Sequence, residues 1–167
     1  MRVPTLAPAV SRHSIPALVS LVHEGVTVGY EFGLHSLGAL ARVAETVEES
    51  VYAAHSLEAT ESGLRFSLWN PPLRLGAFGS ANLRVNGTPV PPAQAQVRKV
   101  AEDAWTSLDR VTPEAPLVWL PDEPREFEAR VGPVPAGEHV TVRLELRNVA
   151  IPPLVWIEIR GAPRVAR

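Results

Sequence analysis

Residues 140–146 read Val-Thr-Val-Arg-Leu-Glu-Leu, and this stretch decides the class of fold. Its apolar residues alternate with threonine, arginine and glutamate, so that every second side chain is apolar. Because successive side chains of a β-strand point to opposite faces, the alternation predicts a strand with one face in a core and the other in solvent. A sheet of such strands has one packed face and one solvated face, which is typical of antiparallel sheets.

Further short runs of β-forming residues surround this stretch, and prolines or glycines separate them. Asn86-Gly87 is a strong signal for a type I′ hairpin that joins a strand at 81–85 to one at 88–90. Since proline is confined to turns, sheet edges and strand starts, the 17 prolines suit short strands with stiff turns. We therefore predict a mainly β fold, an antiparallel β-sandwich of about 8–9 strands. The other strands expected lie at 64–68, 117–120, 127–131 and 154–159.

Residues 36–50 (SLGALARVAETVEES) form the clearest helical pattern in the chain. Their apolar residues recur at steps of three and four, which places them on one face of an amphipathic helix. Ser36 is a suitable N-cap residue for this helix. We expect the apolar face, which includes Leu37 and Leu40, to pack on the sandwich or on a neighbouring subunit.

The segment before this helix allows two interpretations. Residues 26–31 alternate with a period of two, which favours a hairpin over 17–32 that turns at Glu24-Gly25. The alternative is a short helix that begins at Ser14 and ends at Gly25. Residues 1–16 contain three prolines and no periodicity, so we expect an extended arm that is ordered by packing on another surface.

Length and composition indicate how the chain is organised. With 167 residues, of which 46% are hydrophobic and 20% charged, it fits one folded domain with an extension of about 50 residues. We predict the extension at 1–56 and the β-sandwich domain at 57–167. No apolar run approaches about 20 residues, and the N-terminus lacks a signal-peptide pattern, so we expect a cytoplasmic protein.

Charge and cysteine content exclude several classes of function. A formal net charge of −2, without clustered positive charge, argues against binding to nucleic acid or to an anionic membrane. The chain contains no cysteine, which excludes disulfides, thiolate zinc sites and cysteine nucleophiles.

No pattern of residues in the sequence indicates a catalytic site. There is no Gly-x-Ser-x-Gly elbow, because residues 76–80 (GAFGS) are typical of a glycine-rich turn, and Lys99 follows no phosphate-binding loop. The carboxylate pairs at 48–49, 102–103 and 122–123 fit solvated faces or turns better than an acid–base couple. Four of the five histidines lie in the first 56 residues near Glu24 and Glu31, so a His/carboxylate metal site is conceivable. Their spacing matches no tight ligand pattern, and we assign no metal or other cofactor to this chain; the histidines are His13, His23, His35, His55 and His139.

The four tryptophans fall into two groups by their neighbours. Trp119 and Trp156 lie inside apolar runs, and we expect them in the core. Trp69 comes directly before an Asn-Pro-Pro turn, and Trp105 follows the polar pair 102–103, so both are candidates for a contact surface.

A contact surface of rigid aromatics, arginine and proline-stiffened turns loses little conformational entropy on binding. Residues 69–75 (WNPPLRL) have this character. The alternative is that Trp69 closes one end of the sandwich. The residues predicted for an interface are Trp69, Arg74, Trp105, Asp109 and, on the helix face, Leu37 and Leu40.

Several segments of the second half, taken in order, resemble a known family. They include 66–74 (FSLWNPPLR), 85–91 (VNGTPVP), 105–109 (WTSLD) and 135–147 (PAGEHVTVRLELR), followed by the Ile-Pro-Pro at 151–153. Over roughly residues 60–153 this succession resembles the small β-subunits of bacterial C-glycoside deglycosidases. Those subunits have a Val-Asp-Gly hairpin, a Trp-x-x-Leu-Asp segment and a Gly-Glu-His strand before an Ile-Pro end. Asn86 stands where that family usually has Asp, and residues 1–56 have no counterpart in its pattern.

The resemblance implies a β-sandwich subunit that docks on a larger barrel subunit similar to sugar isomerases. That partner would hold a divalent metal and most of the catalytic groups, and would cleave the bond between a 3-oxo sugar and an aromatic aglycone by deprotonation. Whether the present chain is an enzyme is left open. Two other classes of function stay open as well. One is a self-assembling structural protein, such as a capsid-decoration or filament subunit, and the other is a carbohydrate-binding module with tryptophan platforms.

Overall fold

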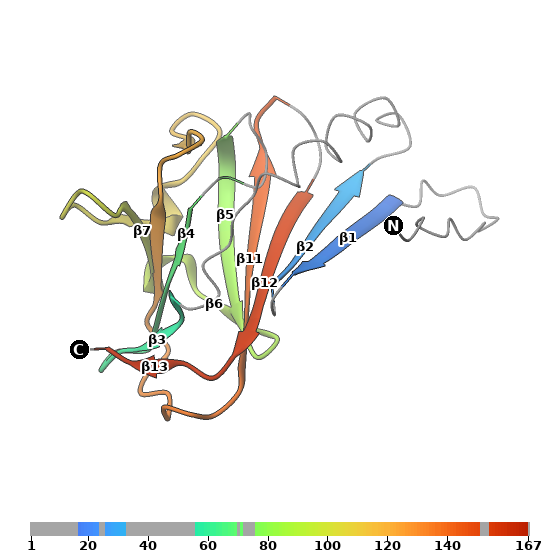
Figure 1. Ribbon diagram of the computed structural model, residues 1–167. Coiled ribbons are helices and arrows are strands. Elements are labelled where there is room, and N and C mark those ends of the chain that lie inside the picture. The colour runs from blue at the N-terminus through green and yellow to red at the C-terminus, as the bar shows by residue number, and fades with distance from the viewer. Residues whose placement is uncertain are drawn as a thin grey trace.

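The computed structural model describes residues 17–23, 26–32, 56–69, 71, 76–150 and 154–166. These residues lie mainly in strands, which form two largely antiparallel sheets (Figure 1). The mainly β class predicted from the sequence is therefore confirmed. The arm expected at 1–16 and the helix expected at 36–50 lie outside the described residues. Within the described part of the chain, no helix is long and apolar enough to span a membrane.

The first sheet contains the alternating stretch at 140–146. This stretch belongs to strand β11, which pairs antiparallel with β12 on one side and β5 on the other. The strand order is β1-β2-β12-β11-β5-β6, and β9 pairs with the start of β5. The bounds are Ala17–His23 for β1, Val26–Phe32 for β2, Ala77–Val85 for β5, Thr88–Val90 for β6, Leu117–Val118 for β9, Val140–Asn148 for β11 and Leu154–Gly161 for β12.

The second sheet has the order β13-β3-β4-β10-β7-β8, and its neighbours are antiparallel except for the parallel pair β13–β3. The described residues hold thirteen strands, more than the 8–9 expected, because β3, β8, β9 and β13 have only two residues each. The bounds are Glu58–Ala59 for β3, Leu64–Leu68 for β4, Ala95–Lys99 for β7, Thr106–Ser107 for β8, Arg125–Ala129 for β10 and Arg164–Val165 for β13, with 3-10 helices η3 at Pro92–Gln94 and η4 at Leu108–Arg110.

Residues 17–32 take the hairpin form rather than the helical one. β1 pairs antiparallel with β2, from Ala17 opposite Phe32 to His23 opposite Val26. β2 also pairs with β12, so the N-terminal strands extend the same sheet as β11 and β12. In Figure 1 this hairpin continues the fan of strands that begins with β5.

One core cluster joins the inward faces of the two sheets. Phe78 of β5 packs edge-on against Trp119, and the centroid of Trp119 lies 5.8 Å from that of Phe127 in β10. Phe127 in turn stacks on Phe66 of β4, with centroids 5.3 Å apart. All four rings are fully or almost fully buried. This series of rings crosses from one sheet to the other, so it ties the two sheets together.

Trp119 explains two differences from the expected strands. Its backbone N–H donates to the carbonyl of Gly76 at 2.5 Å, and its indole Nε1 donates to the carbonyl of Glu123 at 2.8 Å. These bonds turn the chain into the core after Val118, so the strand expected at 117–120 has only two residues. The turn expected at 76–80 is wrong, because β5 already begins at Ala77. Gly76 permits a close backbone approach instead, since a Cβ there would collide with the carbonyl of Trp119.

The hairpin predicted at Asn86-Gly87 is confirmed. Both residues have positive φ, 50° and 79°, as a type I′ turn requires. The side-chain oxygen of Asn86 accepts the backbone N–H of Thr141 at 2.8 Å, and the N–H of Asn86 donates to the carbonyl of Thr141 at 2.8 Å. The tip of the hairpin is therefore fixed to the start of β11.

Candidate functional site

Large apolar side chains are exposed at one end of the two sheets, which we call the apolar end. Each is about half exposed; for Trp69 the exposed fraction is 54%. Exposed apolar groups that gather in one place mark contact surfaces more often than scattered ones do. The apolar end consists of Trp69, Val100, Val118, Leu120 and Val149.

Strand register brings these residues together from distant parts of the chain. Trp69 directly follows β4, and Val100 directly follows β7. The last residues of both strands pair with Arg125, the first residue of β10. The carbonyl of the preceding Pro124 also accepts the backbone N–H of Val100 at 3.1 Å. Trp69 and Val100 therefore lie at the same end of the second sheet.

The remaining residues of the apolar end lie near the start of β5, in the first sheet. The backbone N–H of Val149 donates to the carbonyl of Ala77 at 3.0 Å, and Val118 pairs with the same residue. Arg125 links this part to the second sheet, because its guanidinium donates to the carbonyl of Val118 at 2.6 Å and to Glu123 at 3.3 Å.

The guanidinium of Arg125 is itself buried. Burial lowers the pKa of Arg125 below its ordinary value, while the nearby carboxylates of Glu123 and Glu102 act in the opposite direction. An arginine stays protonated at neutral pH even so, and its fixed fork of donors makes it a suitable link under the loop at 118–123.

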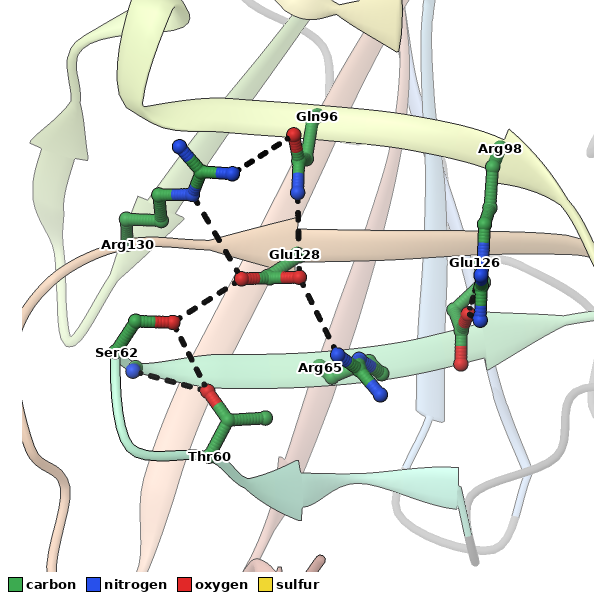
Figure 2. Close-up of polar contacts among 9 residues, drawn as sticks. Thr60, Ser62, Arg65, Gln96, Arg98, Glu126, Glu128 and Arg130 are labelled. Carbon is green, nitrogen blue, oxygen red and sulfur yellow. Dashed lines mark hydrogen bonds and ion pairs between the residues drawn. The ribbon is translucent and has the colours of Figure 1, made fainter. Parts of the chain in front are cut away.

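The outer face of the second sheet carries a polar network centred on Glu128 of β10 (Figure 2). Its side chain is buried, and its carboxylate accepts hydrogen bonds from three neighbours. The donors are Ser62 at 3.1 Å, Gln96 of β7 at 3.3 Å and Arg65 of β4 at 3.4 Å. Arg130 approaches the same carboxylate to 3.8 Å. A buried carboxylate with this many partners rigidifies the sheet face.

A second ion pair lies beside this network. Nε of Arg98 donates to Glu126 at 2.6 Å (Figure 2). The ring of Trp105 lies next to this pair, 4.5 Å from the guanidinium carbon of Arg98 and 5.8 Å from that of Arg65. Both distances suit cation–π attraction. Trp105 is therefore half-buried and held against the sheet face by arginines of its own chain.

Three of the residues predicted for an interface, Trp69, Trp105 and Asp109, fall in the described part of the chain. Trp69 lies exposed at the apolar end. Trp105 lies over the polar network, and Asp109 is exposed in η4. Arg74, Leu37 and Leu40 lie outside the described residues. The sequence did not point to the aliphatic part of the apolar end, because single exposed valines and leucines carry no pattern of their own.

The two tryptophans expected in the core are both buried, but in different places. Trp119 lies in the core cluster between the sheets. Trp156 lies on the opposite face of β12 from the core residues Val155 and Ile157, outside that cluster. The guanidinium of Arg143 covers its ring at 4.4 Å.

Of the five histidines, the structure describes His23 and His139, whereas His13, His35 and His55 lie outside the described residues. His139 is exposed, and no group of three potential metal ligands lies together within the described part of the chain. Glu102 forms an ion pair with Lys99 at 3.3 Å. Asp122 occupies a turn with φ of 64°, and the carboxylate of Glu123 contacts Arg125. Glu102 and Glu123 therefore take part in ion pairs and Asp122 in a turn, while the pair at 48–49 lies outside the described residues.

The apolar end can bury apolar area against another protein, and the outer face of the second sheet offers a rigid polar surface beside it. No protein-family model matches the chain, and no curated protein sequence matches it either.

Proposed function

We propose that this chain is an accessory β-sandwich subunit of a sugar-processing lyase complex, similar to the small subunits of C-glycoside deglycosidases. In this proposal a larger, isomerase-like barrel subunit docks on the apolar end. The partner holds the divalent metal and most of the catalytic groups, and the complex is cytoplasmic. The ordered resemblance over residues 60–153 supports the choice of partner.

The observation that carries the proposal is the exposure of Trp69 beside other apolar side chains. A half-exposed tryptophan next to aliphatic residues is a typical interface anchor, because it buries a large area without losing many rotamers. The hydrogen bonds of Arg125 and Trp119 fix the loop at 118–123, so this side of the surface is ordered before a partner binds. Preorganisation of this kind lowers the entropic cost of binding.

The experiment is capture of the barrel subunit by the tagged full-length chain, with Trp69→Ala as the test variant. Trp69 is about half exposed, so the substitution should lower the free energy of unfolding by no more than about 2 kcal/mol. Loss of a central anchor should weaken capture at least about 30-fold. Val165→Ala removes an exposed valine outside the apolar end and is the matched control.

Recovery of an isomerase-like barrel protein with the wild-type chain and Val165→Ala, but not with Trp69→Ala, is the expected result. If Trp69→Ala melts the isolated chain, Trp69 closes the core and the interface assignment is wrong. If the wild-type chain is recovered alone and monomeric, the accessory-subunit proposal fails.

A self-assembling structural protein is the second candidate, and one observation favours it. Among the described residues, β1 pairs only with β2 and forms an edge of the first sheet. Its sequence, ALVSLVH, contains no proline, lysine or acidic residue, the devices that usually protect edge strands. Light scattering on the purified chain separates the candidates, because a structural subunit should give large homo-oligomers.

A further inference from the structure

A shallow pocket of about 350 Å³ lies on the outer face of the first sheet, away from the apolar end. The described residues that line it are charged or polar, apart from one glycine of the hairpin turn. Strands β5, β11 and β12 supply most of them, and all three strands pair side by side. The described lining residues are Arg84, Gly87, Thr141, Arg143, Glu145 and Glu158.

Strand register sets two like charges against each other in this pocket. Arg84 of β5 stands directly opposite Arg143 of β11. Like charges directly opposite in an antiparallel pair are destabilising. Glu145 offsets part of this repulsion, since one of its carboxylate oxygens lies 3.3 Å from Nε of Arg84 and 3.1 Å from Nε of Arg143. The two arginines thus share the carboxylate of Glu145.

The two guanidinium groups contact Glu145 through Nε, which leaves their terminal N–H groups to face a ligand. Within the described residues these two contacts are ion pairs, and the buried Nε of Arg143 makes no well-directed hydrogen bond there. Each guanidinium offers five N–H donors in a planar fork that matches an oxyanion. The ring of Trp156 lies 4.4 Å from the guanidinium carbon of Arg143 and holds it in position.

Acceptors and a hydroxyl group line the same pocket. Glu158 of β12 stands directly opposite Arg143, and Arg160 pairs with one of its carboxylate oxygens at 2.6 Å. Glu145 and Glu158 therefore add two negative charges beside three arginines. A doubly charged phosphate would be repelled by both glutamates. A singly charged carboxylate would be repelled less, and hydroxyl groups on the same molecule could donate to the glutamate oxygens.

We propose that this pocket binds a small hydroxylated carboxylate of about monosaccharide size, a sugar acid in chemical class. Its carboxylate bridges Arg84 and Arg143, and its hydroxyl groups donate to Glu145 and Glu158. This pocket and the apolar end share no residue, so failure of the docking proposal would leave the binding proposal untouched, and the reverse.

The test is titration of the full-length chain with glucuronate, with glucose and with inorganic phosphate. The readout is the NMR chemical shift of the Gly87 and Thr141 amides and of the Trp156 indole N–H. Glucuronate and glucose share a ring and differ in the carboxylate. We expect glucuronate to shift these signals and to bind at least about tenfold more tightly than glucose or phosphate. A factor of this size corresponds to one additional charge-assisted, bidentate contact.

Two variants with the same change of charge give the control. Arg84→Gln should weaken glucuronate binding at least about tenfold, whereas Arg147→Gln, an exposed arginine of β11 outside the pocket lining, should change it less than about twofold. The side chain of Arg84 is 43% exposed, so Arg84→Gln should stay folded, and an unchanged melting temperature verifies this. Absent shifts, equal binding of glucose or phosphate, or equal effects of the two variants would overturn the assignment.

Discussion

A single backbone contact, between Gly76 and Trp119, determines where the side chain of Trp119 lies. The carbonyl of Gly76 accepts the N–H of Trp119, and the two backbones approach so closely that no Cβ fits at position 76. This contact turns Trp119 into the core, where its ring joins the aromatic residues of both sheets. The sequence Gly-Ala-Phe-Gly-Ser at 76–80 gives no sign of such a close approach, and its two glycines are more typical of a turn, which is why a turn was expected there.

Gly76→Ala should therefore lower the free energy of unfolding by at least about 1–3 kcal/mol, since the added methyl group forces the two backbones apart. The measurement is urea denaturation followed by circular dichroism. Gly161→Ala is the control, because a Cβ at Gly161 meets nothing within 4 Å. A loss for Gly76→Ala no larger than that of the control would mean that the close approach does not stabilise the fold.

At the scale of elements, the strongest local patterns predicted their strands well. The alternation at 64–68 gives β4 with the expected bounds, and the run at 140–146 lies within β11. The expected strand at 127–131 begins two residues earlier, at Arg125, because pairing with β4 and β7 sets its register. β7 was not predicted, since only two apolar residues, Ala95 and Val97, alternate with polar ones in its short sequence AQVRK; its pairing with β10 makes it a strand.

The hairpin between β5 and β6 gives a prediction at this scale. Gly87→Ala should destabilise the protein by about 1–2 kcal/mol, because its φ of 79° is strained for a residue with a Cβ. Gly87→Asn should cost less, since asparagine tolerates this conformation better. Chemical denaturation of the three proteins compares them directly. Equal stability of the alanine and asparagine variants would show that φ is not the cause.

At the scale of the whole molecule, the core and the candidate sites differ in how far sequence could predict them. Core residues occur at every second position along the longer strands, so the alternation of apolar and polar residues in the sequence identified them. The residues of the apolar end lie at or just after the ends of β4, β7, β9 and β11. These segments are far apart in the sequence, and only the strand topology brings them together. Trp69 was predicted because its proline-rich turn is a local signal, whereas Val118 and Val149 had none. The pocket of Arg84 and Arg143 likewise depends on cross-strand register.

Because one core cluster joins both sheets, the strands should unfold together. We expect one cooperative transition in urea, with the same midpoint for far-UV circular dichroism, which reports the sheets, and for tryptophan fluorescence, which includes Trp119 between them. Separate midpoints would mean that the two sheets unfold as independent units.

The pairing of β2 with β12 has a consequence for synthesis on the ribosome. Val28 of β2 lies opposite Ile157 of β12, which the ribosome makes 129 residues later. At a translation rate of roughly 5–20 residues per second, this interval lasts roughly 6–26 s. Throughout that time the N-terminal hairpin exists without the strand that joins it to the sheet. We therefore expect the nascent chain to expose the unpaired edge of β2 for seconds, and we expect chaperones that act near the ribosomal exit to bind it.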